Sequence, residues 1–220
     1  MTTASEQLAL EERLLEDHGR ASRARSALLW ECERALVVSQ LDTLLPGFED
    51  AARDSAHDGW PVAVRKTGGS AVALGPGVLN FSVIESWRGT PPALAHGFDL
   101  VCTPIIRALA QLGVTGTIGT APGSFCDGRH NVLVHGRKIA GTAQRRTKRG
   151  EGGALLAHAL ILIDADPGAL TDAVQKFYVR AGASRQFDAS VVTSLHKCRS
   201  DRGDHDLLAG FAQSLRLCAT

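Results

Sequence analysis

The chain has 220 residues, 44% of them hydrophobic and 21% charged, and its 24 Lys and Arg nearly balance its 23 Asp and Glu. This composition is typical of a soluble globular protein and excludes the collagen-like, disordered and disulfide-rich classes. A formal net charge of +1 gives no global field, and no apolar run approaches the roughly 18 residues of a membrane-spanning helix. We therefore expect no nucleic-acid partner and no membrane partner.

Five cysteines are scattered along the chain without a CxxC pair or a zinc-ligand spacing: Cys32, Cys102, Cys126, Cys198 and Cys218. Their odd number and wide spacing favour free thiols, and the acidic, amphipathic amino terminus is unlike a secretory signal. We therefore expect a cytoplasmic protein. No repeat, low-complexity block or long linker divides residues 1–220, which predicts a single domain.

The first half of the chain is predicted to hold one helix and then several short strands. Leu8, Leu14 and Leu15 share one face of a helix over residues 5–17. Apolar runs of strand length follow at residues 28–30, 35–38, 61–65 and 78–84, with a polar stretch over 49–59. In the last of these runs, Leu79, Phe81 and Val83 face one way, and Asn80 and Ser82 face the other.

The second half mixes helices with a hairpin. A helix is predicted over 98–112, where Pro104 marks its start or a bend, and a hairpin turns at His135-Gly136. A strand over 155–163 precedes Asp166-Pro167, a typical helix start, and further helices are predicted over 188–196 and 206–217. Strands dominate the middle and helices flank them without strict alternation, which favours an α+β fold with a mixed sheet.

A glycine turn, Arg65-Lys66-Thr67-Gly68-Gly69-Ser70, lies between two predicted strands. Glycines let the backbone approach a ligand closely, and successive N–H groups can bind an anionic or carbonyl oxygen. The turn and its basic residues therefore suggest a site for an anion or an acyl group. Its spacing matches neither GxxxxGK[ST] nor GxGxxG, and a tight hairpin turn without a ligand is the alternative interpretation.

Cys126 lies in a glycine-flanked loop, GSFCDG, and the basic residues Arg129, His130, Arg137 and Lys138 follow it. Nearby positive charge lowers the pKa of a thiol and favours the thiolate, the form that attacks a carbonyl carbon. Cys126 is therefore a candidate nucleophile. An inert buried thiol is the alternative, and it is what we expect of the other four cysteines.

Three further features follow the cysteine. Lys138 stands at a strand start, where it would polarise a carbonyl, support a thiolate or accept a proton, or else remain a solvated hairpin lysine. The basic run over 145–149 is either solvated or docks an acidic partner. His158, in an apolar strand, is either a core residue or a site residue. No acidic pair or His/Asp cluster indicates a metal site.

In this order and spacing, the segments resemble the lipoate–protein ligase and octanoyltransferase superfamily, whose fold is related to that of biotin protein ligase. The family's basic residue, Ser/Thr-Gly-Gly turn and Leu-Asn-Phe-Ser strand are matched by VRKTGGSAVALGPGVLNFS over residues 64–82. Its Lys-Ile-Ser/Ala-Gly strand is matched by GRKIAGTAQRR over 136–146, and its late Val-Thr-Ser-Leu by residues 191–195. The resemblance covers nearly the whole chain and implies a biotin/lipoate protein ligase-like catalytic domain, α+β with helices flanking the sheet.

Within the superfamily, SFCDG resembles the Phe-Cys-Pro-Gly loop of the cysteine-dependent octanoyl amidotransferases, with Asp127 in place of proline. ATP-dependent ligases generally lack this cysteine and often have an accessory carboxy-terminal domain, which we do not expect in residues 1–220. The resemblance implies Cys126 as the nucleophile and Lys138 as the residue that assists proton transfer or orients the carbonyl. It implies substrate binding by Arg65, Thr67, Gly68, Gly69, Ser70, Asn80, Gly141, Thr142 and His158.

The implied reaction moves an octanoyl or lipoyl group to the lysine of a lipoyl domain through a thioester on cysteine. Backbone N–H groups at Gly68, Gly69, Gly141 and Thr142 would bind the oxyanion. The resemblance implies acyl-carrier protein or the glycine-cleavage H protein as donor and lipoyl domains of 2-oxoacid dehydrogenase complexes as acceptors, without a cofactor or metal. We expect the C8 chain to lie in a tunnel along the apolar face of the strand over 78–84.

Two other functions remain open. An ATP-dependent lipoate–protein ligase would act through an acyl-adenylate, need ATP and Mg²⁺, and keep its activity in Cys126→Ala. A non-catalytic partner of a separate ligase subunit would bind lipoyl domains without turnover. Ser70 and Leu74 stand where many ligases have glycine and histidine, which favours the amidotransferase branch.

Overall fold

The computed structural model describes residues 2–20, 24–199 and 207–219, which form two β-sheets of unequal size. The strands of the larger sheet are β1 (Arg25–Trp30), β5 (Val78–Arg88), β6 (Thr117–Gly119), β7 (Asn131–Val134), β8 (Arg137–Arg149) and β9 (Gly152–Leu162). They lie in the order β1-β5-β9-β8-β7-β6, and every neighbouring pair is antiparallel.

The smaller sheet contains β2 (Ala35–Ser39), β3 (Val62–Arg65) and β4 (Val72–Leu74). Its middle strand, β2, is parallel to β3 and antiparallel to β4. The predicted α+β class with a mixed sheet is confirmed, and the parallel pair lies in the smaller sheet.

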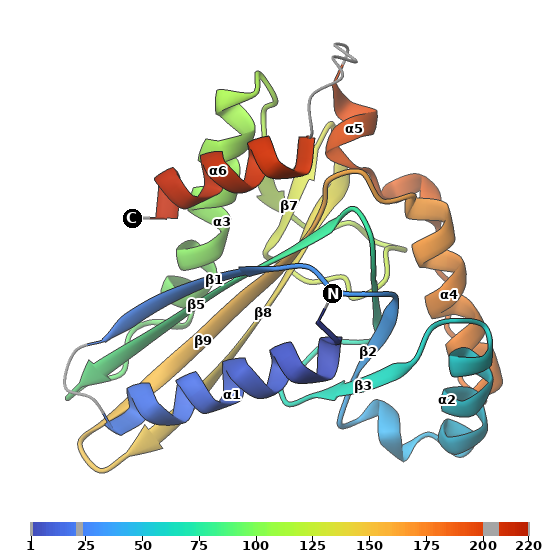
Figure 1. Cartoon of the computed structure of the whole chain (residues 1–220), viewed down its shortest axis with the longest axis horizontal. Coiled ribbons are helices and arrows are strands. Elements are labelled where there is room, and N and C mark those ends of the chain that lie inside the picture. Colours follow the sequence, from blue (N-terminus) through green and yellow to red (C-terminus); the bar gives the residue numbers. More distant parts are fainter. Residues whose placement is uncertain (1, 21–23, 200–206, 220) are drawn as a thin grey trace.

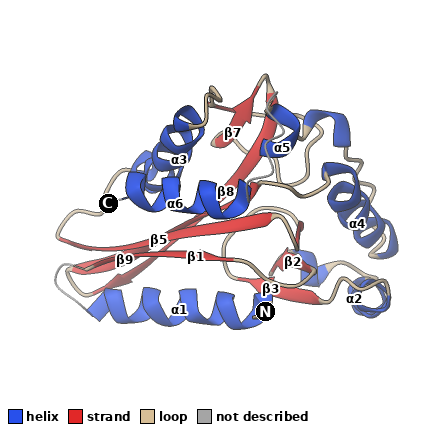
Figure 2. Cartoon of the chain, turned by 45° about the horizontal axis from the view of Figure 1, so that its top comes forward, coloured by secondary structure: helices blue, strands red, loops and turns tan. Residues whose placement is uncertain are grey.

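Helices cover both sheets. They are α1 (Ala4–Arg20), α2 (Phe48–His57), α3 (Leu94–Gln111), α4 (Pro167–Arg180), α5 (Leu195–Cys198) and α6 (Leu207–Ala219), with 3₁₀ turns η1 (Asp42–Leu44) and η2 (Ala189–Val191). Figures 1 and 2 show α1 along one face of the larger sheet, α3 and α6 on the opposite face, and α2 and α4 beside the smaller sheet. The two sheets meet near the start of α1 (Figure 2).

The long strand β5 separates the apolar core from a polar cluster because successive side chains point to opposite faces. Leu79, Phe81 and Val83 pack in the core that β5 shares with α3. Asn80 and Ser82 lie on the other face and line a pocket. The predicted acyl tunnel along the first face is therefore wrong, since helix packing fills that face.

Most elements with clear periodicity form where the sequence predicts them. The first helix, the hairpin at His135-Gly136 and the last helix are confirmed. Asp166 caps α4, and its carboxylate accepts bonds from the backbone N–H groups of Gly168 (3.4 Å) and Ala169 (3.1 Å). The helix α3 begins at Leu94, before the predicted start, and Pro104 lies inside it.

Two segments form structure that the sequence analysis does not predict. The polar stretch over 49–59 contains α2, which buries only Ala51 and Ser55, four residues apart. The helix predicted over 188–196 is wrong. Val192 instead bridges to Lys138 of β8 in a parallel arrangement, and the 3₁₀ turn and short α5 stand on either side of this bridge.

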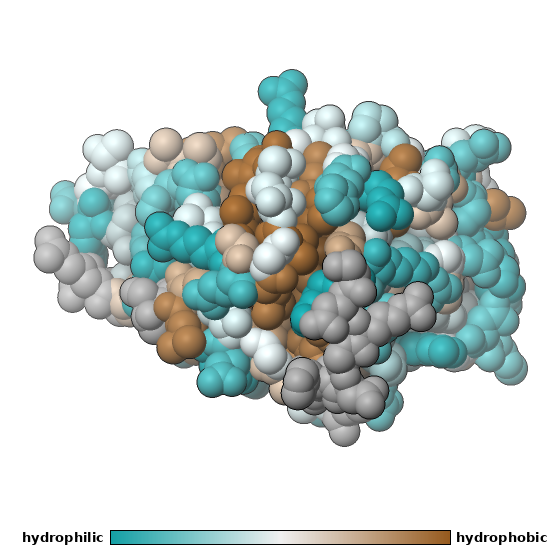
Figure 3. Space-filling model, turned by 90° about the horizontal axis from the view of Figure 1, so that it is seen from above, coloured by the Kyte–Doolittle hydropathy of each residue, from teal (hydrophilic) through white to brown (hydrophobic). Residues whose placement is uncertain are grey.

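Seen from above, apolar surface gathers in one central band between hydrophilic margins (Figure 3). Among the described residues, no helix combines the length and the apolar character that crossing a membrane requires.

Candidate active site

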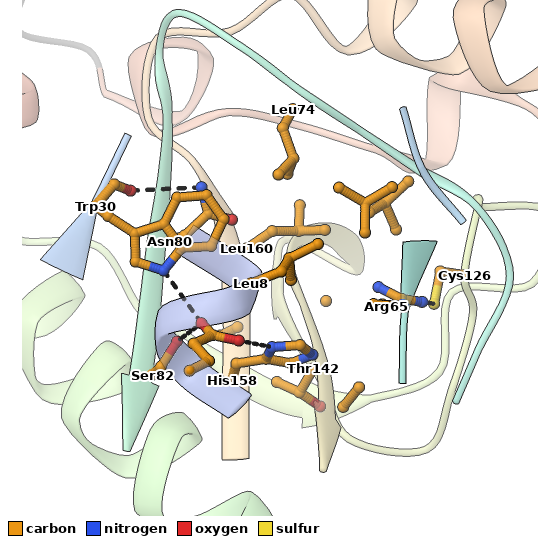
Figure 4. A pocket seen from close by; sticks show the side chains of 16 residues that line it. Leu8, Trp30, Arg65, Leu74, Asn80, Ser82, Cys126, Thr142, His158 and Leu160 are labelled. Carbon is orange, nitrogen blue, oxygen red and sulfur yellow. Dashed lines mark hydrogen bonds and ion pairs between the residues drawn. The ribbon is translucent and has the colours of Figure 1, made fainter. Parts of the chain in front are cut away.

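A pocket opens where the two sheets meet beside α1 (Figure 4). Its apolar wall is formed by Leu8, Trp30, Val37, Val72, Leu74, Ala159 and Leu160. Its polar side chains are Glu11, Arg65, Asn80, Ser82, Cys126, Thr142 and His158. Because these residues come from α1, from both sheets and from the cysteine loop, the pocket exists only in the folded chain.

Cys126, in the loop between β6 and β7, adopts a left-handed backbone conformation with a φ of +49°. This conformation costs a residue with a side chain about 1–3 kcal/mol, so its surroundings must hold it in place. Asp127 Oδ1 closes the loop by accepting bonds from Ala121 N (2.8 Å) and Asn131 Nδ2 (2.7 Å). The N–H of Cys126 donates to Ser70 Oγ (2.9 Å), which joins the loop to the glycine turn.

Lys138 holds the same loop through hydrogen bonds to its backbone. Its side chain is fully buried, and Nζ donates to the carbonyl oxygens of Phe125 (2.6 Å) and Cys126 (2.8 Å). Burial lowers the pKa of Lys138 to about 8, although the charges of Cys126 and Asp127 oppose this effect. A Cβ at Gly141 would lie 2.9 Å from Lys138 Cε, so this position needs glycine. The solvated-lysine alternative is excluded by the burial.

The guanidinium of Arg65 lies beside the thiol. Its Nη2 is 3.5 Å from Cys126 Sγ and also donates to the carbonyl oxygen of Ser70 (2.8 Å). Burial alone would raise the pKa of the Cys126 thiol, but the charges of Arg65 and Lys138 hold it below its ordinary value. At Cys102, burial and the charge of Asp99 raise the pKa of the thiol to about 12. Cys126 is thus the thiol prepared to ionise.

The glycine turn provides room for this pair of side chains. Gly69 has a φ of +100°, and a Cβ there would lie 2.6 Å from Cys126 Sγ and 2.9 Å from Arg65 Nη2. At Gly68, by contrast, an added Cβ would meet no atom within 4 Å. The turn therefore lets the Cys126 thiol and the Arg65 guanidinium approach the backbone closely, and binding of a ligand by this turn stays a prediction.

A buried polar cluster forms the far side of the pocket. Glu11 Oε2 lies 3.1 Å from His158 Nδ1, and Glu11 Oε1 accepts bonds from Trp30 Nε1 (3.1 Å) and the Ser82 hydroxyl. His158 Nε2 lies 3.1 Å from Thr67 Oγ1, which connects α1 through β9 to the glycine turn. Burial would raise the pKa of Glu11, but His158 and these hydrogen bonds hold it below its ordinary value.

Glu11 and Trp30 are site residues that the sequence analysis missed. A signal for Glu11 existed: it stands three residues after Leu8 and four before Leu15, on the apolar face of the first helix. A carboxylate at such a position is buried and needs partners. Trp30 carried no comparable signal, because an indole at the end of an apolar strand is also an ordinary core residue.

The structure brings nearly all the predicted site residues to one place. Those that line the pocket are Arg65, Asn80, Cys126, Gly141, Thr142 and His158. Those that contact the lining residues are Lys138, Thr67, Gly69 and Ser70. Gly68 lies in the same turn without such a contact. Asn80 Nδ2 donates to Trp30 O (3.4 Å), and Thr142 Oγ1 donates to His130 O (2.7 Å).

The basic run over 145–149 begins with two arginines that interact within the chain. Arg145 pairs with Glu12 of α1. Arg146 donates to the carbonyl oxygens of Pro92 and Ala93, both at 2.7 Å. Docking of an acidic partner on this run stays a prediction. Among the described residues, no group of three or more His, Cys, Asp or Glu side chains is placed to hold a metal ion.

Comparisons with known proteins agree on one family. Residues 3–209 match the model of the lipoyl protein ligase A/B catalytic domain. The chain is 35% identical to an octanoyl-[GcvH]:protein N-octanoyltransferase of Kyrpidia tusciae, covering 85% of this chain and 68% of that protein. It is 34% identical to an uncharacterized protein of Cupriavidus necator, covering 86% and 82%. A crystal structure of lipoate–protein ligase A with ATP shares the fold at a TM-score of 0.72 and 19% identity, covering 96% of this chain and 77% of that one.

Proposed function

This chain belongs to the lipoyl protein ligase A/B catalytic domain family, and we propose that it is an acyltransferase acting through a thioester on Cys126. The donor is the octanoylated glycine-cleavage H protein, as in the name of the Kyrpidia relative, and the acceptor is the lysine of a lipoyl domain. One observation carries the proposal. Cys126 is held in a strained turn, between the charges of Arg65 and Lys138, at the wall of an apolar pocket.

In the first step, the Cys126 thiolate attacks the carbonyl carbon of the octanoyl-lysine amide. A C–S bond forms, the oxygen becomes negative, and the C–N bond then breaks as the carbonyl re-forms. The leaving amine takes a proton from the Lys138 ammonium, whose pKa near 8 suits this transfer at neutral pH. The products are the octanoyl thioester of Cys126 and the free lysine of the donor.

In the second step, the amine of the acceptor lysine attacks the thioester and gives its surplus proton to the neutral Lys138. The C–S bond breaks, and the Cys126 thiolate returns beside Arg65. One amide is thus exchanged for another, and both protons and charges balance over the cycle. This chemistry needs neither ATP nor a metal ion, because the acyl group is already bound to the donor as an amide and is transferred to the amine of the acceptor lysine.

The apolar wall of the pocket suits the hydrocarbon chain of the acyl group. Leu8, Leu74 and Leu160 lie between Cys126 and the indole of Trp30 in Figure 4, which gives a C8 chain an apolar path. Burying such a chain contributes about 0.8 kcal/mol for each methylene group. The acyl group therefore binds on the Asn80 face of β5.

Intact-protein mass spectrometry without ATP tests the proposal. The protein is mixed with octanoylated H protein and, separately, with octanoyl-acyl-carrier protein. We expect an octanoyl adduct that neutral hydroxylamine removes, and its absence in Cys126→Ala. Cys218→Ala is the matched control, because this partly buried thiol of α6 lies outside the pocket and should leave the adduct unchanged.

Other results would favour the other two functions. ATP-dependent modification of a lipoyl domain by both the wild type and Cys126→Ala, with no adduct, would replace the transferase by a ligase. Binding of a lipoyl domain with neither adduct nor turnover would identify a non-catalytic partner.

A further inference from the structure

Arg65 has a donor that the folded chain does not use. The side chain is buried, with 6% of its surface exposed, at the end of β3. Its Nη2 interacts with the Ser70 carbonyl oxygen and Cys126 Sγ. Its Nε is buried and has no hydrogen-bond partner among the described residues. Buried N–H groups are nearly always paired, so this one indicates an acceptor that arrives with a substrate.

We propose that Arg65 is a catalytic residue, which holds the Cys126 thiolate before attack and donates its Nε–H to the oxygen that becomes negative after attack. This inference rests on the proposed acyl transfer and names a residue for the step that stabilises its tetrahedral intermediate. It adds a side chain to the backbone N–H groups that the family resemblance implies.

The shape of the guanidinium supports this assignment. Nε–H and one N–H of Nη2 lie on the same edge of a planar group, the fork by which arginine binds two neighbouring acceptor atoms. Nη2 already lies against Cys126 Sγ, and both side chains line the pocket (Figure 4). When the carbonyl carbon of the substrate is bonded to Cys126 Sγ, its oxygen becomes the second acceptor for this edge of the guanidinium.

Lys138 is less suited to this task. Its ammonium already donates to the carbonyl oxygens of Phe125 and Cys126, so most of its donors hold the loop. The two cations therefore have separate roles in the same reaction. Lys138 supports the strained turn and exchanges a proton with the amine, whereas Arg65 follows the negative charge as it moves from sulfur to oxygen.

The charge movement is balanced. As the C–S bond forms, the electron pair of the C=O π bond moves to oxygen, and the charge leaves sulfur. As the intermediate collapses, the pair returns, the C–N bond breaks, and the nitrogen takes the proton of Lys138. Arg65 acts only as a hydrogen-bond donor and transfers no proton in either step.

Two variants separate the two roles of Arg65. Arg65→Gln removes the charge and the fork, whereas Arg65→Lys keeps a charge but has no Nε donor. Arg20→Gln is the matched control, because this arginine at the end of α1 lies outside the pocket, has a side chain that is 60% exposed, and pairs with Asp17 at 3.3 Å. Melting temperatures establish that each variant folds.

Two readouts are needed, and neither requires the natural donor. The pH dependence of iodoacetamide alkylation of Cys126, followed by peptide mass spectrometry, reports the thiolate. The burst of p-nitrophenol from p-nitrophenyl octanoate reports acylation. We expect Arg65→Gln to shift the alkylation midpoint to higher pH and to slow the burst by about 10²–10³-fold. Arg20→Gln should change neither. Arg65→Lys should keep a midpoint near that of the wild type and still acylate slowly.

Specific results would overturn the inference. An unchanged midpoint and burst in Arg65→Gln would remove both roles. A slower burst explained entirely by the lost thiolate fraction, or a full-rate burst in Arg65→Lys, would remove the oxyanion role. If the wild type forms no adduct with octanoylated H protein, the proposed donor fails, while the alkylation midpoint and the p-nitrophenol burst still decide the role of Arg65.

Discussion

Replacing Gly69 with alanine tests the close packing on which the site depends. Its φ of +100° costs an L-residue about 1–3 kcal/mol. The new Cβ would also lie 2.6 Å from Cys126 Sγ and 2.9 Å from Arg65 Nη2, well inside the contact distance of about 3.5–4.0 Å. One of these groups must therefore move by roughly 1 Å, and a misplacement of that size costs about 10²-fold in rate.

The assay measures the melting temperature of the variant and its rate of thioester formation. A loss of 1 kcal/mol lowers the melting temperature of a chain of this size by about 2–4 °C, so Gly69→Ala should melt measurably lower. Thioester formation on Cys126, followed by mass spectrometry in time, should slow by about 10²-fold.

Gly68→Ala is the paired variant, because its Cβ meets nothing within 4 Å and its φ lies outside the left-handed region. It should keep the melting temperature and the alkylation rate of Cys126. Thioester formation at the wild-type rate in Gly69→Ala would refute the argument from close packing. If Gly68→Ala and Gly69→Ala lower the melting temperature equally, the destabilisation does not come from the contact of the new Cβ with Cys126 and Arg65.

Three other changes have definite outcomes. The acylation rate should fall at low pH, where the Cys126 thiolate takes up a proton despite its lowered pKa, and again above about pH 8, where Lys138 loses the proton for the leaving amine. An acylation rate that does not change over this pH range would contradict the assignment. Trp30→Ala removes the indole across the pocket from Cys126 in Figure 4 and should let dodecanoyl donors compete with octanoyl donors, as measured by the adducts in mass spectra. An unchanged preference for octanoyl donors would place the end of the acyl chain elsewhere. His158→Leu leaves the buried carboxylate of Glu11 without this hydrogen-bond partner and should lower the free energy of unfolding by about 1–3 kcal/mol in urea titrations. A neutral effect would show that the other hydrogen bonds of Glu11 suffice.

Sequence patterns predict the helices and strands that depend on residues close together in the chain. The spacing of Leu8 and Leu15 predicted a helix, and the N-cap of Asp166 predicted another, because capping and amphipathic periodicity act within one or two turns. The turn at Gly69 is predictable for a related reason, because a positive φ favours glycine. Gly141 has no such local signal, and its place in the site is predicted from the family resemblance alone.

Features that depend on distant partners could not be predicted in this way. The alternation in β5 showed two faces, but not that α3 covers the Phe81 face and leaves the pocket to the Asn80 face. Val192 was assigned to a helix, yet its partner is Lys138 in another element. The bond from Thr193 N to Lys138 O (2.8 Å) continues this pairing, and such contacts outweigh local helix propensity.

The residue after Cys126 shows how a departure from the pattern of the resembled family can keep the same physical effect. Proline stiffens a loop by fixing its own φ, whereas Asp127 has no such ring. Its carboxylate instead bonds to Ala121 N and Asn131 Nδ2, which restrains the loop on both sides of Cys126. Its charge also opposes the effect of burial on the pKa of Lys138 and so favours the ammonium that the leaving amine needs. Hydrogen bonds and charge therefore do at this position what a covalent ring does in the related loop, and they add an electrostatic contribution that proline lacks.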